Sequence, residues 1–217
     1  MPLPATPART EATEALLAAA ESLLVEVGYA GITVRRLAER AGVNHGLVHY
    51  YFGSMQDLLL QVVERFTDGL IERQRAMYAA DVPFIDKWRQ AMRFLDEDAD
   101  SGYQKIWFEL QALGWNDRAV RERLQGVHQR WVDVLMPAFE AGLAELGVDA
   151  ERYPTRAVVS LVVTFNEGII AERLAGVDSG HRELLRMIDH LLERLEKEAR
   201  ECERASLTER DRSAETQ

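Results

Sequence analysis

Apolar residues recur every three or four positions along most of this chain, the spacing at which side chains share one face of an α-helix. The clearest stripe lies between Thr10 and Gly28, at Leu16, Ala19, Ala20, Leu23, Leu24 and Val27. Similar stripes predict further helices over residues 34–41, 45–52, 54–80, 84–98, 102–114, 117–147, 154–174 and 181–203. The sequence has neither the alternation of a β-strand nor an internal repeat. It therefore predicts an all-α fold.

Residues 33–58 carry the most specific pattern, two short helices joined by a tight turn. Thr33 is a favourable N-cap for the first helix, and Gly42 supplies the left-handed conformation in which helices often end. Asn44 is a second N-cap, so the next helix is expected to begin at His45. Helices joined by so short a glycine-containing turn cross steeply, which is the arrangement of a DNA-binding helix-turn-helix.

The segments between the helices predict the domain organisation. Residues 1–8 are rich in proline and are expected to form a flexible arm. A long helix beginning near Ser54 would span roughly 37 Å and link two parts of the chain. We therefore predict an arm and a three-helix DNA-binding domain over residues 1–53. A helical ligand-binding and dimerisation domain follows over residues 54–217, with a charged tail that frays from about residue 204.

Two helices near the C-terminus predict a dimer. Helix 154–174 is apolar on nearly every side, so it has to be covered all round. Helix 181–203 is amphipathic, with one apolar stripe at Leu184, Leu185, Ile188, Leu191, Leu192 and Leu195. Two such helices doubled by a two-fold axis form a four-helix bundle, so we predict a homodimer through these two helices. The alternative is that helix 154–174 is the centre of a monomeric core.

The composition is that of a globular protein, with 47% hydrophobic residues in a chain of 217. The single cysteine, Cys202, excludes an intrachain disulfide and is typical of a reducing compartment. No apolar run approaches the roughly 20 residues that span a bilayer, and the N-terminus lacks the pattern of a signal peptide. We therefore expect a cytoplasmic protein with no membrane partner.

The net charge of −10 limits how the chain can bind nucleic acid, because phosphate contacts need local positive charge. Residues 1–60 contain four arginines against six acidic residues. Any DNA contact is therefore expected to come from a small face of the N-terminal helices.

The N-terminal pattern resembles the DNA-binding domain of the TetR (tetracycline-repressor-like) family of transcriptional regulators. The residues that carry the resemblance are Gly28-Tyr29, Thr33-Val34-Arg35, Leu37-Ala38, Ala41-Gly42-Val43, Gly46, Tyr51-Phe52, Ser54 and Leu58. The rest of the chain is similar only in its helical layout. The resemblance implies a homodimeric repressor whose C-terminal domain binds a small ligand that releases the protein from DNA.

The resemblance also implies which residues contact DNA. The phosphate contacts fall on Thr33, Asn44 and Tyr51. The groove-facing positions fall on His45, Gly46, Leu47, His49 and Tyr50. A glycine lets the helix approach DNA closely, and a leucine can make only an apolar contact, such as one with a thymine methyl group. The alternative is that Leu47 and Tyr50 belong to the core, for which we expect Val43, Val48 and Phe52.

Three positions depart from the family pattern: His45, His49 and Met55 stand where lysine, tyrosine and lysine are frequent. Because histidine gains charge near pH 6.5, we expect DNA affinity to rise as the pH falls from about 8 to 6. A metal pair at His45 and His49 is the competing interpretation. No third ligand is evident, and Gly46 stands where a zinc-protease motif requires glutamate, so we expect neither metal nor cofactor.

The C-terminal part contains all four tryptophans and several other rings that are suited to a lipophilic pocket with a few polar anchors. The candidate ligand-binding residues are Trp88, Met92, Trp107, Gln111, Trp131, Phe165 and Asn166. Ordinary core packing explains such rings equally well. Asn166 is more specific, because a polar group in an apolar helix needs a partner, which can be a ligand, the second subunit or an arginine.

The expected function is a homodimeric, DNA-binding transcriptional regulator. We expect a repressor whose partners are double-stranded operator DNA and a small, lipophilic effector. An architectural helix-turn-helix protein without a ligand is the first alternative. An all-α enzyme is the second, and the sequence argues against it because it has no nucleophile and base at catalytic spacing, no P-loop and no dinucleotide fingerprint.

Overall fold

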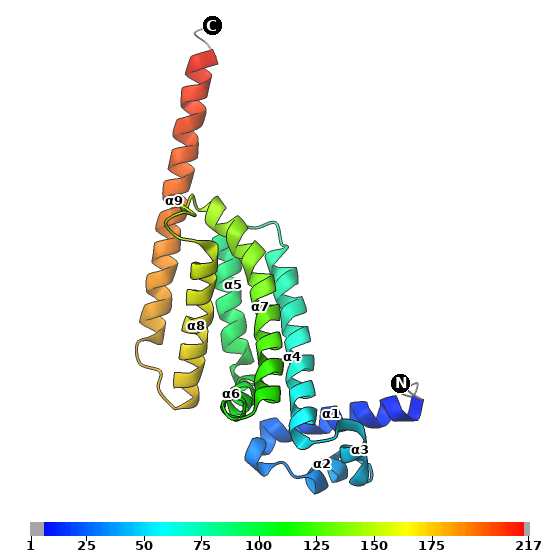
Figure 1. Cartoon of the computed structure of the whole chain (residues 1–217). Coiled ribbons are helices and arrows are strands. Elements are labelled where there is room, and N and C mark those ends of the chain that lie inside the picture. Colours follow the sequence, from blue (N-terminus) through cyan, green and yellow to red (C-terminus); the bar gives the residue numbers. More distant parts are fainter. Residues whose placement is uncertain (1–6, 215–217) are drawn as a thin grey trace. The chain divides into compact units, whose positions relative to one another are not determined.

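The computed structural model describes residues 7–214, and within this range the chain is helical without strands (Figure 1). This confirms the predicted all-α fold. The elements in chain order are α1 (Pro7–Val27), η1 (Tyr29–Gly31), α2 (Val34–Ala41), α3 (Gly46–Phe52), α4 (Met55–Tyr78), α5 (Phe84–Glu97), η2 (Asp98–Asp100), α6 (Tyr103–Gly114), α7 (Arg118–Glu145), α8 (Thr155–Leu174) and α9 (His181–Ala214).

The two ends of the chain differ from the sequence expectations. The predicted arm over residues 1–8 lies outside the described residues except for its last two, and these already belong to α1. At the other end, α9 continues to Ala214 instead of fraying from about residue 204. Hydrogen bonds between side chains and the helix backbone, such as Ser206 Oγ to Cys202 O at 3.0 Å, accompany this extension.

The chain divides into two compact units. Among the described residues, the first unit extends to Glu72 and resumes over Glu97–Arg130, whereas the second comprises Arg73–Asp96 and the chain from Trp131 onward. Helices α4 and α7 therefore contribute to both units. The predicted boundary between the DNA-binding and ligand-binding domains, after residue 53, falls inside the first unit. The division of the two functions at this residue stays a prediction.

The first unit is built around the three N-terminal helices and the first part of α4. Leu16 and Leu24 of α1, Leu37 of α2 and Val48 of α3 are almost completely buried. The guanidinium of Arg65 on α4 forms an ion pair with Glu14 on α1. The same hydrophobic spacing that predicted the helices thus also supplies the core in which they pack.

The second unit has an aromatic core. Its buried residues are Phe84, Trp88, Phe139, Leu146 and Val159. The rings of Phe84 and Phe139 meet edge to face, with their centroids 5.2 Å apart. Partly buried side chains of α8 and α9 pack against this cluster, so these two helices lie side by side (Figure 1).

Helices α8 and α9 leave apolar residues uncovered in the single chain. Only Val159 and Ile169 of α8 are buried, although the helix is apolar on nearly every side. Leu161 on α8 is 68% exposed, and Met187 and Leu191 on α9 are 62% and 44% exposed. The core of one chain therefore does not cover α8 all round, as a monomeric core would have to.

Within the described chain, no helix combines the length and the apolar character needed to cross a membrane.

Candidate DNA-binding surface and ligand pocket

The turn between α2 and α3 is fixed by the residues that the sequence singled out. Thr33 Oγ1 accepts a hydrogen bond from the backbone N–H of Arg36 at 3.2 Å, as expected of an N-cap. Gly42 has a φ of +67°, and the following N–H of Val43 donates to Ala38 O at 3.0 Å. These contacts complete the end of α2 and direct the chain into α3.

The start of α3 lies one residue later than predicted. Asn44 Oδ1 accepts a hydrogen bond from the backbone N–H of Gly46 at 2.9 Å. His45 already has helical backbone angles, but α3 itself begins at Gly46. Asn44 therefore satisfies a free N–H of the first turn, although the boundary moves by one position.

The exposed side of α3 contains most of the predicted groove-facing residues. Tyr50 is 69% exposed and is therefore not a core residue. His45, Gly46 and His49 are also exposed, whereas Leu47 is half-buried. The buried side of the helix is formed by Val48 and Phe52, as predicted. The remaining predicted core residue, Val43, is only half-buried.

The three predicted phosphate-contacting residues occupy different settings. Thr33 and Asn44 are exposed, and both side-chain oxygens already accept a backbone hydrogen bond in a helix cap. Tyr51 is half-buried, and its ring meets the ring of Tyr50 with the centroids 5.1 Å apart. Thr33 directly precedes α2, Asn44 lies in the turn between the two helices, and Tyr51 lies on α3.

His49 makes a local contact with the backbone at the end of α3. Its Nδ1 lies 3.2 Å from the carbonyl oxygen of Gly53. A carbonyl oxygen only accepts, so this hydrogen bond requires a hydrogen on Nδ1. The contact therefore orients the imidazole ring on the exposed side of α3.

The arginines of α2 are all bound within the protein. Arg35 forms an ion pair with Glu39 at 2.8 Å, and Arg36 donates to the carbonyl oxygen of Gly31 at 2.9 Å. Arg40 binds Glu26 through two hydrogen bonds of 2.7 Å, which lower the pKa of Glu26 to about 2. The ion pairs offset the charge of Arg35 and Arg40, whereas Arg36 keeps its full positive charge because a carbonyl oxygen is neutral.

The seven predicted ligand-binding residues do not form one group in the structure. Trp107 and Gln111 belong to the first unit, and the other five belong to the second. Trp88 is 4% exposed and belongs to the aromatic core, against which Met92 and Phe165 pack. The prediction that Trp88 binds a ligand came from its apolar pattern, and periodicity cannot distinguish an aromatic ring in the core from one that lines a pocket.

Asn166 and Trp131 are both half-buried in the second unit. The side-chain oxygen of Asn166 is buried and has no hydrogen-bond partner among the described residues. Buried polar atoms usually have a partner, so the prediction that Asn166 pairs with a ligand, the second subunit or an arginine stays a prediction.

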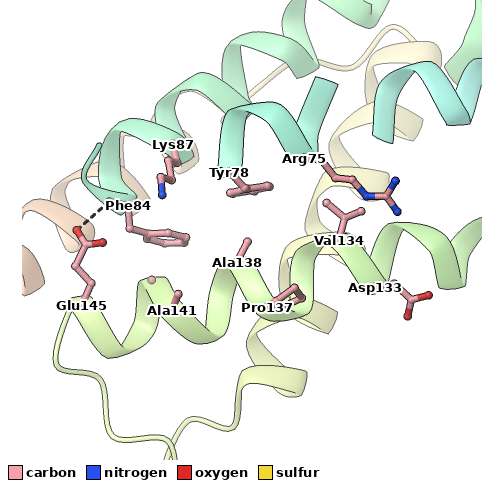
Figure 2. Close-up of a pocket in the computed structure, with 11 residues that line it drawn as sticks. Arg75, Tyr78, Phe84, Lys87, Asp133, Val134, Pro137, Ala138, Ala141 and Glu145 are labelled. Atoms are coloured by element: carbon pink, nitrogen blue, oxygen red, sulfur yellow. Dashed lines mark hydrogen bonds between the residues drawn. The ribbon is translucent and has the colours of Figure 1, made fainter. Parts of the chain in front are cut away.

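A pocket of about 350 Å³ lies elsewhere in the second unit (Figure 2). It is lined by Arg75, Tyr78, Phe84, Lys87, Asp133, Val134, Pro137, Ala138, Ala141, Gly142 and Glu145. None of the seven predicted residues lines it. The sequence signal for this pocket is the group of small residues and a proline on α7, which leaves space beside Phe84.

The described residues contain no group of three histidine, cysteine, aspartate or glutamate side chains that could hold a metal ion.

Comparisons with known proteins show which family the N-terminal part of the chain matches. Residues 16–62 match the sequence model of "Bacterial regulatory proteins, tetR family". The transcriptional regulator CymR of Pseudomonas putida is 31% identical over 134 residues, which cover 56% of this chain and 64% of CymR. The chain thus matches less than two thirds of that relative's length. The transcriptional repressor KstR2 of Mycobacterium tuberculosis is 23% identical over 141 residues, covering 63% of this chain and 70% of KstR2.

The solved structures agree on the fold. The regulator FadR of Bacillus subtilis, crystallised with stearoyl-CoA, aligns with a TM-score of 0.67 and 17% identity. The alignment covers 82% of this chain and 96% of FadR. The sequence match spans α2, the turn and α3, where the capping contacts described above form a helix-turn-helix. Residues 16–62 thus carry the sequence pattern of the TetR family of bacterial regulatory proteins, and the relatives support a TetR-family transcriptional regulator.

Proposed function

We propose that this protein is a homodimeric repressor that binds operator DNA through α3 and is released by a small molecule. The observation that carries the proposal is the α2–turn–α3 segment, in which a capped, glycine-containing turn presents the exposed side of α3. In DNA-binding proteins this geometry inserts the second helix into the major groove. The name of the relative KstR2, a transcriptional repressor, supports the direction of regulation.

The residues proposed to contact DNA divide into two groups. Thr33, Asn44 and Tyr51 contact phosphates and set the register of the protein on the duplex. The α3 positions read the groove: His45, Gly46, Leu47, His49 and Tyr50. Since two of the three arginines of α2 are paired with carboxylates, affinity is proposed to depend strongly on this close fit and less on phosphate attraction.

The proposed dimer forms through α8 and α9. Leu161, Met187 and Leu191 are exposed in the single chain and would be buried by a second copy. In a dimer with a two-fold axis both subunits use the same surface patch, so the apolar residues of one subunit cover the same residues of the other. A homodimer also supplies two copies of α3 for the two half-sites of an operator. Leu161→Glu is expected to convert the dimer to a monomer in sedimentation experiments, whereas the exposed Glu183→Gln leaves it dimeric.

The proposed effector site lies in the helical region after residue 53. The pocket in the second unit supports this proposal, as does the FadR structure, whose title names a bound stearoyl-CoA. Helix α4 contributes to both units, so it is the element proposed to couple effector and DNA. An effector releases DNA only to the extent that it prefers the arrangement unable to bind DNA. Because it acts on operator DNA, the proposed location is the cytoplasm.

The test begins with selection of binding sites from fragments of the genome that encodes the protein, followed by fluorescence anisotropy. Tyr50→Ala is expected to weaken binding to the selected DNA by at least about tenfold, since it removes an exposed contact residue. Trp115→Ala is the matched control, because Trp115 is an exposed aromatic residue of the same unit but lies outside α3. Equal effects of the two variants, or no selected sequence at all, would contradict the proposal.

A further inference from the structure

The pocket of the second unit has a floor of small residues. Ala138, Ala141 and Gly142 lie along α7 together with Pro137, and Phe84 of α5 stands against them (Figure 2). Small side chains leave space that larger ones would fill. The resulting volume of about 350 Å³ lies at the lower end of the range for small-molecule sites.

Most of the charged groups around this pocket already have partners. Glu145 Oε1 accepts a hydrogen bond from the backbone N–H of Phe84 at 2.9 Å. Arg75 and Asp133 each take part in further interactions within the protein. Three of the four charged residues that line the pocket are therefore committed to contacts within the protein.

Lys87 is the exception. It is half-buried and lines the pocket, and its side-chain ammonium group forms no hydrogen bond or ion pair with any described residue. Its side chain points from α5 towards α7 (Figure 2). A partly desolvated ammonium group without a carboxylate partner favours an anion nearby.

Tyr78 supplies a second polar group in the pocket. Its ring packs edge to face on Phe139, and burial raises the pKa of its hydroxyl far above the ordinary value. The hydroxyl therefore stays neutral and can donate a hydrogen bond at physiological pH. It has no hydrogen-bond partner among the residues that the structure describes.

We propose that this pocket binds a small amphipathic carboxylate. The carboxylate pairs with Lys87 and accepts a hydrogen bond from Tyr78, and the apolar part lies on Phe84 and the floor of α7. A ligand with an amine head group is the opposite choice. It would leave the ammonium group of Lys87 without an anion, and Glu145 Oε1 already accepts the backbone N–H of Phe84. Only the further step, that this ligand is the effector, rests on the proposed function.

The test uses three probes with the same chain and different head groups: octanoate, octanol and octylammonium. Binding to the purified full-length protein without DNA is measured by calorimetry. Octanoate is expected to bind at least about tenfold more tightly than the other two, because only its head group carries the negative charge that forms an ion pair with the lysine. Tightest binding of octylammonium, or no binding of octanoate, would overturn the inference.

Variants locate the binding site. Lys87→Met and Tyr78→Phe are each expected to weaken octanoate binding, by about tenfold for the lysine. Ala141→Trp fills the pocket and is expected to abolish binding in a folded protein. Lys197→Met is the matched control, since Lys197 is an exposed lysine of α9 paired with Glu201. Octanoate binding that is unchanged in both Lys87→Met and Ala141→Trp would refute the assignment.

A separate measurement distinguishes this inference from the proposed function. DNA binding is assayed first without octanoate and then at saturating octanoate. Octanoate binding that requires Lys87 but leaves DNA affinity unchanged supports the pocket assignment and contradicts the effector role. A wild-type protein that recognises the operator but does not bind octanoate overturns the pocket assignment and leaves the DNA-binding proposal intact.

Discussion

The ring of Phe84 lies so close to the backbone of Gly142 that a β-carbon at position 142 would stand 2.1 Å from the Cδ2 atom of the ring. The backbone N–H of Phe84 is at the same time bound to Glu145, one turn further along α7. Phe84 is thus held at both its ring and its backbone. This contact fixes the start of α5 against α7 and forms one wall of the pocket.

Substitution of Gly142 by alanine should destabilise the protein. A heavy-atom distance of 2.1 Å cannot be accommodated without displacing Phe84 or α7, and such overpacking costs about 1–3 kcal/mol. Chemical denaturation measures the change in the free energy of unfolding. Gly126→Ala is the control on the same helix, because its added β-carbon meets nothing within 4 Å. It should stabilise the protein by up to about 1 kcal/mol, and an equal gain for both variants would contradict the packing account.

The ion pair between Arg89 on α5 and Asp189 on α9 predicts a pH dependence of stability. Two hydrogen bonds of 2.8 and 2.9 Å from Arg89 hold the pKa of Asp189 below its usual value. The pair therefore stabilises the native state above about pH 4, where unfolded aspartate is ionised, and this contribution is lost as the pH falls further. Both side chains are about a third exposed, so solvent screening limits the effect at pH 7 to about 1 kcal/mol.

Thermal and denaturant unfolding of Asp189→Asn test this expectation. The variant should be less stable than the wild type at pH 7, and the difference should shrink towards pH 3. Glu183→Gln removes an acid from an exposed pair on the same helix and should change little at either pH. If the difference in free energy of unfolding between the wild type and Asp189→Asn grew as the pH fell, the account of this ion pair would be contradicted.

Gly46→Ala should separate folding from DNA binding. The added β-carbon would meet only Asn44 Oδ1, at an ordinary 3.4 Å, so the folded protein has room for it. In the proposed complex with DNA, the same methyl group would lie between α3 and the groove. We expect at least about a tenfold loss of DNA affinity, because close base contacts are lost. Anisotropy and denaturation measure the two effects. Gly69→Ala, with open space at its β-carbon in α4, should leave affinity unchanged.

The two histidines proposed to face the DNA groove predict that DNA affinity depends on pH. His45 and His49 are exposed beside the positions proposed to face phosphates. Histidine gains charge as the pH falls from about 8 to 6, so the wild type should bind DNA more tightly at the lower pH. Replacement of both histidines by glutamine should flatten the profile in anisotropy titrations at constant ionic strength. A steep profile in the double variant would assign the effect to other groups.

The helix-turn-helix was predictable because its signals are local. The cap at Thr33 and the turn at Gly42 depend on neighbours within a few residues, and the structure has both. Asn44 was predicted as the N-cap of α3, but that position is occupied by His45, and Asn44 accepts the backbone N–H of Gly46 from one residue earlier. Capping chemistry in the sequence is therefore sufficient to locate this element to within one residue.

The pocket was not predictable from the same signals. Tyr78, Lys87 and Gly142 come from three helices, and their meeting depends on how those helices cross. Hydrophobic periodicity identifies which side of a helix is buried, but it does not distinguish a ring in the core from one in a cavity. Trp88 illustrates this, because it satisfies the apolar pattern and lies in the aromatic core. The small residues of α7 indicate a pocket only when the position of Phe84 beside them is known.

The most direct test of the central claim is a footprint of the wild-type protein on DNA selected from the genome that encodes it. A homodimer that reads DNA through two copies of α3 should protect an inverted repeat, with half-sites related by whole helical turns. The protected repeat should disappear with Tyr50→Ala and persist with Trp115→Ala. Protection without sequence preference, or protection that survives loss of the Tyr50 ring, would contradict the account.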